Sequence, residues 1–241
     1  MSAIKVENLT VIYLDKKDNQ FPVLTDFSCE FKDDCINIIL GASGSGKTTL
    51  YKAICGLFNY DGNIYIDGVE TSKIRRKDRH ISYFSQDLFM FSHMIVYDIL
   101  AYPLKREKYK PDEIDSMIKN IADDFQIKHL LTRKPDQLSI GQRQMVLLAK
   151  SLIKKPKICF LDEPFSNLDP QSIELAIKLI KEYKDNNKTT LYITTHNLKE
   201  VTPICDYLCY IKDGKCKYYG EYATTPDEIL GECNLDNEQS N

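Results

Sequence analysis

The sequence has no tryptophan, only four histidines, and no apolar run near the roughly 18 residues that a membrane-spanning helix needs. Residues 1–8 lack the basic start and following apolar block of a secretory leader. The 32 Lys and Arg are balanced by 35 Asp and Glu, for a formal net charge of -3. This balance is unlike the clustered basic charge of a nucleic-acid-binding protein. We therefore expect a cytosolic chain without a leader, a membrane span or a nucleic-acid partner.

The eight cysteines include no CxxC pair and have no histidine at zinc-ligand spacing. We interpret them as reduced thiols that serve as small apolar residues. Hydrophobic residues make up 43% and charged residues 28% of the chain, the composition of a folded domain. No internal repeat is visible. Residues 221–241 form an acidic C-terminal tail with six acids and no Lys or Arg, and we expect the part after Gly231 to be mobile.

The pattern of apolar residues predicts an α/β fold in which helices interrupt a sheet domain. A Gly-rich turn follows the third of the early β-type runs, and a helix should begin at Lys47. Between residues 87 and 157 the pattern becomes helical, with breaks near Pro111 and Pro135. Strand patterns return afterwards, and Asp213-Gly214 is a typical hairpin dipeptide. The strands are expected at Ala3–Tyr13, Phe27–Phe31, Ile36–Leu40, Gly62–Asp67, Ile81–Ser85, Ile158–Leu161, Thr189–Thr194 and on both sides of Asp213-Gly214.

The Gly-rich turn matches the pattern G-x-x-x-x-G-K-[ST], directly after an apolar strand and directly before a helix. In such a loop the glycines let successive backbone N–H groups point at phosphate oxygens, and the following helix presents its positive end. Lys47 would contact the β and γ phosphates, and the Thr48 hydroxyl would bind Mg²⁺. The predicted ATP-binding residues of this loop are Gly41, Ala42, Ser43, Gly44, Ser45, Gly46, Lys47, Thr48 and Thr49.

Two adjacent acids, Asp162 and Glu163, follow an apolar run that is typical of a buried parallel strand. Ligands bind at this carboxyl edge in open α/β sheets. We expect Asp162 to hold Mg²⁺, through water, and Glu163 to polarise the attacking water. His196 follows another strand pattern, and its imidazole would bond the γ phosphate and keep that water in line.

Two further residues complete the predicted site. Gln86 closes a strand and would supply another oxygen to Mg²⁺, at a joint between the sheet and the helical segment. Tyr13 ends the first strand pattern and would stack on adenine, a role that one tyrosine among 15 indicates only weakly.

With these residues in place, the chain resembles the ATP-binding cassette (ABC) ATPases over about residues 3–220. The most specific match is Leu138-Ser139-Ile140-Gly141-Gln142, which resembles the signature segment of that family. Residues 166–169 resemble its intersubunit loop. The resemblance implies a P-loop NTPase (RecA-like) core, about residues 1–86 and 158–220, with an N-terminal antiparallel β-subdomain and a helical subdomain inserted at 87–157. It also implies ATP hydrolysis with ATP and Mg²⁺ bound.

The family resemblance implies a dimer, of two identical or two different ATP-binding subunits, in which each subunit completes the ATP site of the other. Ser139, Gly141, Gln142 and Asp169 would contact the nucleotide of the partner subunit. A helix N-terminus at Ser139 gives this a physical basis, because it forms a second anion-binding end. Two positions depart from the family pattern: Ile140 replaces Gly and Met145 replaces Arg. We expect hydrolysis to be weakened but retained.

The stretch from Arg76 to Lys105 resembles ATPase subunits of bacterial importers, especially those for carbohydrates. It implies an integral membrane permease that docks near Gln86 to Tyr97, a solute-binding protein, and a position at the cytoplasmic face of the membrane. Met and aromatic side chains between Phe89 and Met94 suit such a groove, although they would also suit packing inside the helical segment. Export, a non-transport ABC ATPase and a regulatory nucleotide-binding subunit stay open, as does the cargo.

Overall fold

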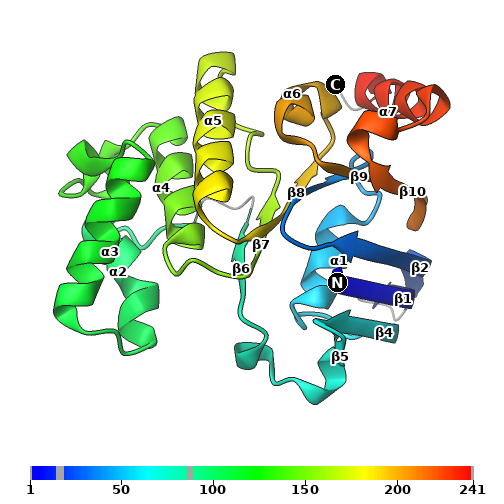
Figure 1. Ribbon diagram of the computed structural model, residues 1–241, viewed down its shortest axis with the longest axis horizontal. Coiled ribbons are helices and arrows are strands. Elements are labelled where there is room, and N and C mark those ends of the chain that lie inside the picture. The colour runs from blue at the N-terminus through cyan, green and yellow to red at the C-terminus, as the bar shows by residue number, and fades with distance from the viewer. Residues whose placement is uncertain (1, 15–18, 86–88, 240–241) are drawn as a thin grey trace. The chain divides into compact units, whose positions relative to one another are not determined.

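The computed structural model describes residues 2–14, 19–85 and 89–239 (Figure 1). The chain divides into two compact units. Unit 1 contains residues 1–81 and 190–241, and unit 2 contains residues 82–189.

Unit 1 begins with an antiparallel sheet in the strand order β2-β1-β4-β5. Its strands are β1 (Ser2–Leu14), β2 (Gln20–Lys32), β4 (Asp61–Ile66) and β5 (Val69–Glu70). Alternate residues of β2 are buried, and Val6 of β1 pairs with both Cys29 and Ile64. The predicted N-terminal antiparallel subdomain is therefore confirmed. β2 starts seven residues before the expected Phe27, because pairing with β1 holds these mostly exposed residues in strand conformation.

The second sheet of unit 1 contains β10 (Lys215–Glu221), β9 (Tyr207–Lys212), β3 (Ile36–Leu40) and β8 (Thr190–Thr195), in that order. β3 runs parallel to both neighbours and is buried at every residue, which explains why its sequence is apolar except for the hydrogen-bonded Asn37. Asp213 and Gly214 both have positive φ, 52° and 69°, as a two-residue hairpin turn requires. Helix α1 (Lys47–Ile54) follows β3 through the Gly-rich turn.

The C-terminal segment of unit 1 is helical. Helix α7 (Asp227–Gln239) contacts the short helix α6 (Leu198–Val201). Cys233 is fully buried, and Lys212 pairs with Glu232 at 3.4 Å. The described part of the tail is helical up to Gln239 and carries a buried side chain and an ion pair, while the predicted mobility after Gly231 stays a prediction.

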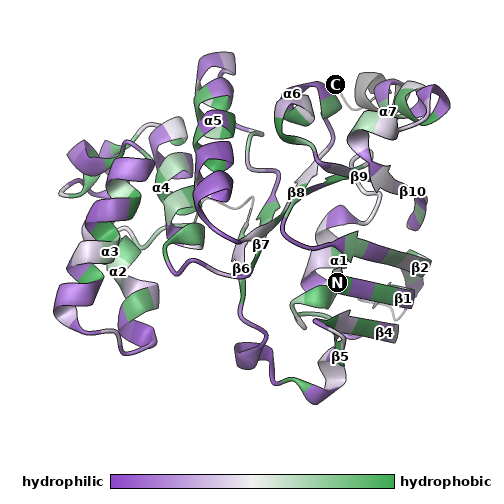
Figure 2. Cartoon of the chain, in the orientation of Figure 1, coloured by the Kyte–Doolittle hydropathy of each residue, from purple (hydrophilic) through white to green (hydrophobic). Residues whose placement is uncertain are grey.

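Unit 2 contains the helices α2 (Val96–Arg106), α3 (Pro111–Asp124), α4 (Ile140–Leu152) and α5 (Pro170–Asn186). Its strands β6 (Ile81–Phe84) and β7 (Ile158–Asp162) are neighbours. Figure 2 shows hydrophilic and hydrophobic patches alternating along α3 and α5, the pattern of helices that bury one side. Short 3-10 turns lie at Thr71–Lys73, Arg76–Asp78, Lys128–Leu130, Pro135–Gln137, Thr202–Ile204 and Tyr222–Thr224.

The predicted breaks in unit 2 occur where proline begins an element. Pro111 starts α3 and Pro135 starts a 3-10 turn. Unit 2 also includes β7 and α5, since the Tyr183 hydroxyl donates to the Leu152 carbonyl at 2.9 Å and the Tyr183 ring packs near Phe125. The narrower insertion at 87–157 stays a prediction. Of the helices in the described ranges, none is both long and apolar enough to cross a bilayer.

Candidate functional site

The loop of residues 41–46 connects β3 to α1 in unit 1 and turns tightly. The Ser45 amide donates to the Ala42 carbonyl at 3.1 Å, and the Leu50 amide donates to the Gly46 carbonyl at 2.8 Å as α1 begins. Gly44 and Gly46 have φ of 80° and 105°, values that other residues adopt at a cost.

Close neighbours also restrict this loop. A Cβ at Gly46 would lie 2.6 Å from Leu24 Cδ2, and one at Gly41 would collide with the Ile211 carbonyl oxygen. Strands β2 and β9 therefore form a wall behind the loop. On its other side Ser43 and Gly44 are exposed, while Ala42 and Ser45 are half-buried. The curled loop thus presents its outer backbone to a ligand.

The features of this loop suit an anion. Lys47 is 6% exposed, and its Nζ donates to the carbonyls of Gly41 at 2.8 Å and Ala42 at 3.0 Å, so its charge lies over the loop. Gly46, at the N-cap, has no side chain to accept from the first N–H groups of α1. Ser45 Oγ is buried and has no hydrogen-bond partner among the residues that the structure describes. Together these features fit a polyphosphate.

Tyr13 and His196 both lie in unit 1 with this loop. The Tyr13 hydroxyl bonds Thr49 Oγ1 at 2.8 Å, and its ring, 37% exposed, meets Phe58 edge-on at 5.2 Å. His196 follows Thr195, which pairs with Leu40 in the parallel β3–β8 ladder. Since Gly41 follows Leu40, His196 and the loop begin at the same sheet edge. Thr48 is half-buried on the first turn of α1.

In unit 2, β7 ends at the two predicted acids. Asp162 is 2% exposed, whereas Glu163 is half-buried. Glu163 has φ of 47°, a left-handed conformation that is uncommon for this residue type and often occurs at functional sites. Its carbonyl accepts from the Ser166 amide at 3.4 Å and the Ser166 hydroxyl at 3.1 Å, which shapes the loop before α5.

The predicted signature segment forms the N-terminus of α4. Ser139 is the N-cap: its Oγ accepts from the Gln142 amide, and Gln142 Oε1 accepts from the Ser139 amide, both at 3.2 Å. Ile140 is 57% exposed, and Gly141 is half-buried. Met145, where the family pattern has Arg, is 8% exposed and belongs to the core of unit 2.

Two contacts connect the start of α4 to the loop after β7. A Cβ at Gly141 would lie 3.3 Å from Leu168 Cδ2, and the Gln144 side chain donates to the Pro164 carbonyl. Gln144 gave no signal in the sequence, because its partner is 20 residues away. The structure therefore brings the signature segment and the segment from Glu163 to Asp169 together within unit 2.

Asp169 caps helix α5. Its carboxylate accepts from the Ser172 amide at 3.0 Å and the Ser172 hydroxyl at 2.6 Å. The Ser172 hydroxyl bond, followed by the backbone bond, lowers the pKa of Asp169 from its ordinary value. Asp169 is thus held as an anion at a helix start.

The predicted docking segment is partly described. Gln86 lies outside the described residues. Phe89 is 71% exposed, and its ring meets Phe91 edge-on at 5.6 Å. Phe91 also contacts the rings of His93 and Tyr102, at 5.9 and 5.6 Å between centroids, while Met90 and Met94 are half-buried. These side chains form an apolar surface on unit 2.

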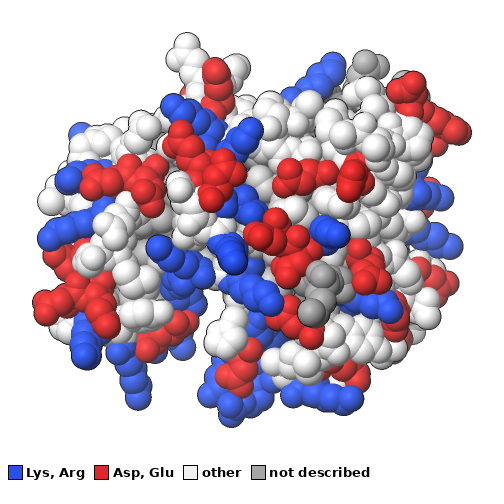
Figure 3. Space-filling model, in the orientation of Figure 1, with Lys and Arg blue, Asp and Glu red and all other residues white. Residues whose placement is uncertain are grey.

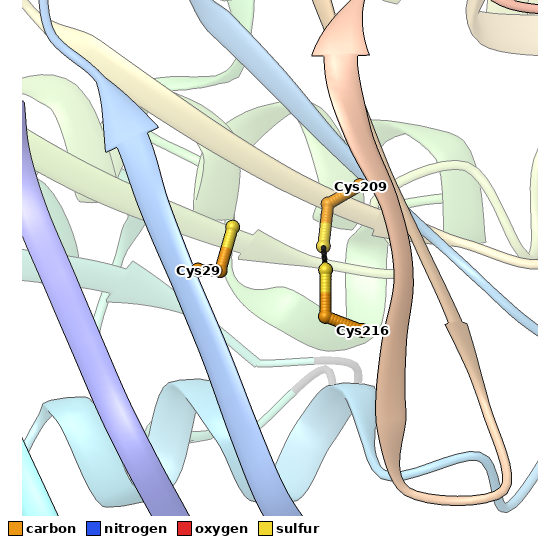
Figure 4. Close-up of side chains that lie close together, drawn as sticks. All are labelled: Cys29, Cys209 and Cys216. Carbon is orange, nitrogen blue, oxygen red and sulfur yellow. Dashed lines mark hydrogen bonds between the residues drawn. The ribbon is translucent and has the colours of Figure 1, made fainter.

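The structure also shows a group that sequence reasoning missed. Cys29, Cys209 and Cys216 converge in unit 1 (Figure 4). Cys29 is far from the other two in sequence, and the spacing of Cys209 and Cys216 matches no metal-ligand motif.

On the face in Figure 3, acidic and basic residues are interspersed, unlike the basic face of a nucleic-acid-binding protein.

Comparison with known proteins matches residues 24–166 to the family model described as ABC transporter. The chain is 34% identical over 219 residues to the molybdate/tungstate import ATP-binding protein WtpC of Pyrococcus abyssi, covering 90% of this chain and 62% of WtpC. It is 31% identical over 231 residues to the oligosaccharides import ATP-binding protein MsmX of Bacillus subtilis, covering 95% of this chain and 61% of MsmX. The chain thus spans about six tenths of the length of these relatives.

Among solved structures, cbiO1 from Clostridium perfringens, described as part of the ABC transporter complex cbiONQ, is similar with a TM-score of 0.82. The two are 28% identical, and the alignment covers 97% of this chain and 95% of cbiO1. The predicted P-loop NTPase fold with an antiparallel N-terminal sheet is confirmed by this similarity and by the sheets of unit 1.

Proposed function

Because this chain belongs to the ABC transporter family, we propose that it is the ATP-hydrolysing subunit of an importer. The observation that carries the proposal is the loop of residues 41–46, with Lys47 Nζ over its carbonyls and the uncapped start of α1 behind it. This arrangement offers backbone N–H groups, one cation and a helix dipole to a triphosphate. Tyr13, already oriented by Thr49, would stack on the base.

The residues predicted to take part in hydrolysis have the following proposed roles. Thr48 would offer its hydroxyl to Mg²⁺, and Asp162, with Gln86, would complete the ligand set. The ion would neutralise charge on the β and γ phosphates. Glu163 would orient and polarise the attacking water, and His196 would bond the γ phosphate. The half-buried position of Glu163 at the end of a buried strand supports this role.

The second half of each site would come from a partner subunit. Ser139 Oγ accepts from the Gln142 amide, so its own O–H can donate to a phosphate oxygen. The Gly141 amide lies in the first turn of α4, where N–H groups lack helical partners. Gln142 and Asp169 would position this surface. ATP would then connect two subunits, each supplying the anion-binding end that the other lacks.

We propose that the surface around Phe89 contacts an integral membrane permease, which would hold the subunit at the cytoplasmic face of the membrane. Phe89 is 71% exposed and backed by Phe91, so it offers apolar area without further rearrangement. The relatives named above are import proteins, which supports import and a solute-binding protein in the full system. WtpC is named for molybdate or tungstate and MsmX for oligosaccharides, so the class of solute stays open.

The decisive experiment measures Mg-ATP hydrolysis and ATP-dependent dimerisation for the wild type and Glu163→Gln. We expect turnover to fall at least about 100-fold, the usual contribution of a general base, while ATP still binds and the dimer persists. Glu174→Gln, on the exposed side of α5, is the control and should behave like the wild type. A Glu163→Gln variant with wild-type turnover would refute the catalytic assignment.

A second function has one observation in its favour. Ile140 places a β-branched, 57% exposed side chain in the signature segment, which would restrict its approach to phosphate. A regulatory subunit that binds ATP without hydrolysing it would show ATP-dependent dimerisation and no turnover in the wild type. The same assay therefore separates the two functions.

The docking surface is tested by Phe89→Ser combined with Met90→Ser. We expect permease binding and coupled transport to be lost, while ATP binding is unchanged. Val69→Ser replaces a residue that is 48% exposed in unit 1 and serves as the control. Normal permease binding by the double variant would contradict the docking assignment.

A further inference from the structure

Three cysteines meet in unit 1 from three different strands. Cys29 lies on β2, Cys209 on β9 and Cys216 on β10, and Figure 4 shows the sulfur atoms of Cys209 and Cys216 facing each other with Cys29 beside them. All three Sγ atoms lie within 4.8 Å of one another. The Sγ atoms of Cys209 and Cys216 are 4.0 Å apart. Cys209 is fully buried, Cys29 is 8% exposed, and Cys216 is half-buried.

The Cys209–Cys216 separation matches that of two ligands in a metal thiolate centre, and Cys29 Sγ lies within 4.8 Å of both. Three sulfurs that bind one ion at about 2.3 Å, with the ion in their plane, are about 4.0 Å apart from one another. A disulfide instead needs two sulfurs about 2.05 Å apart, so Cys209 and Cys216 would have to approach each other by about 2 Å. The existing arrangement is therefore closer to a shared ligand set than to a covalent pair.

The donors restrict the kind of ion. Within the described part of the chain the group contains sulfur donors alone, without a histidine or carboxylate. Soft thiolate ligands select thiophilic ions such as Zn²⁺ and Cu⁺ over Mg²⁺ or Ca²⁺. With three protein thiolates bound, Zn²⁺ keeps a fourth coordination position for a water molecule, and solvent can reach the site beside the half-buried Cys216. Cu⁺ accepts three ligands and needs no fourth.

The position of the group suggests what an ion would do there. β2 belongs to the antiparallel sheet, while β9 and β10 belong to the second sheet of unit 1. A shared ion would therefore connect the two sheets. β2 and β9 also supply the backbone and side-chain wall behind Gly41 and Gly46, so the connection would stabilise the support of the phosphate loop.

We propose that Cys29, Cys209 and Cys216 form a binding site for one thiophilic d¹⁰ metal ion, Zn²⁺ or Cu⁺, that connects the two sheets of unit 1. On binding, each thiol releases its proton to solvent and its sulfur becomes a ligand, so up to three protons leave per ion. No electron is transferred, and the oxidation state of the metal does not change. The site is separate from the proposed ATP site and does not depend on ATP hydrolysis.

The test uses the 241-residue chain, purified under reducing conditions and stripped of metal with a chelator. Zn²⁺ and, under anaerobic conditions, Cu⁺ are titrated separately, with Cd²⁺ as a spectroscopic probe of thiolate ligation. We expect one equivalent of Zn²⁺ or Cu⁺ to bind, Cd²⁺ to show thiolate charge-transfer absorption, and the bound ion to raise the melting temperature. Comparison of the Zn²⁺ and Cu⁺ titrations identifies which ion the site prefers.

Two variants remove single ligands, and each has a matched control. Cys216 is the most exposed of the three cysteines, so Cys216→Ser should disturb folding least. Cys205→Ser is its control, because Cys205 is also half-buried. Cys29→Ser is matched by Cys55→Ser, because both thiols are 8% exposed. Burial raises the pKa of Cys55 to about 12, so this control thiol stays protonated. We expect metal affinity to fall at least tenfold in both ligand variants, and metal-induced stabilisation to disappear, with wild-type behaviour in the controls.

Circular dichroism of each metal-free variant separates loss of the site from loss of the fold. A folded Cys216→Ser protein that binds either ion as tightly as the wild type would overturn the proposal. So would a wild type that binds neither ion stoichiometrically, or one in which Cys209 and Cys216 are joined by a disulfide after purification in reductant.

Discussion

The starts of α1 and α4 are two helix N-termini with opposite local chemistry. Gly46 begins α1 without a side chain that could cap it, whereas Ser139 and Gln142 cap α4 reciprocally. The first arrangement has no side-chain cap, and the second satisfies two backbone N–H groups through side chains. We infer that α1 holds phosphate on its own, while α4 contributes mainly the Ser139 hydroxyl and the Gly141 amide.

Lys47→Ala removes the cation from the α1 side and should have the largest effect on ATP binding. Charge-assisted hydrogen bonds contribute about 2 kcal/mol, so ATP should bind about 30-fold more weakly. The measurement is the Kd for Mg-ATP by calorimetry. Lys178→Ala is the control, because this lysine occupies an exposed position of α5. Equal affinities for Lys47→Ala and the wild type would remove the phosphate loop from the proposed site.

Gly46→Ala tests whether the wall behind the loop fixes its shape. The new Cβ would lie 2.6 Å from Leu24 Cδ2, at φ of 105°, so we expect about 2 kcal/mol of destabilisation from strain and overpacking. Gly68→Ala is the matched control, because Gly68 has φ of 78° and the described structure places no atom within 4 Å of its Cβ position. Urea denaturation compares the two. Similar losses would show that backbone strain alone matters.

Ser139 separates capping from ligand binding at α4. Ser139→Ala should reduce the free energy of unfolding by about 1 kcal/mol, because it removes the N-cap. Ser139→Asp restores the cap but directs a negative charge at the proposed phosphate site, so stability should recover while ATP-dependent dimerisation is lost. Chemical denaturation and size-exclusion chromatography with ATP measure the two properties. An Asp variant that still dimerises would exclude phosphate contact in the partner site.

Ile140→Gly should have the smallest effect, and unlike the other variants it should increase ATP turnover. Removing the exposed β-branched side chain allows the signature backbone more conformations, so we expect ATP turnover to rise a few-fold. Steady-state phosphate release measures the rate, and Leu175→Gly on α5 controls for general loosening. An unchanged or lower rate would show that Ile140 is not what limits the approach of α4.

Much of the proposed site was predictable, because its signals are local. The phosphate loop, its preceding strand and its helix occupy one continuous segment, and the strands before Asp162 and His196 were predicted within a residue or two. The first half of β2 was not predicted, since it includes Pro22, which disfavours a strand, and its conformation depends on pairing with β1. The left-handed conformation of Glu163 also gave no sequence signal.

The sequence by itself determined the Gly-rich loop with the strand and helix beside it, and the family. Only the tertiary structure decided that α7 attaches through Cys233, that Gln144 joins α4 to the Pro164 carbonyl, and that Cys29 meets Cys209 and Cys216. The physical reason is distance along the chain. A loop folds according to its own residues, whereas contacts between segments as far apart as residues 29 and 209 depend on how the two sheets pack.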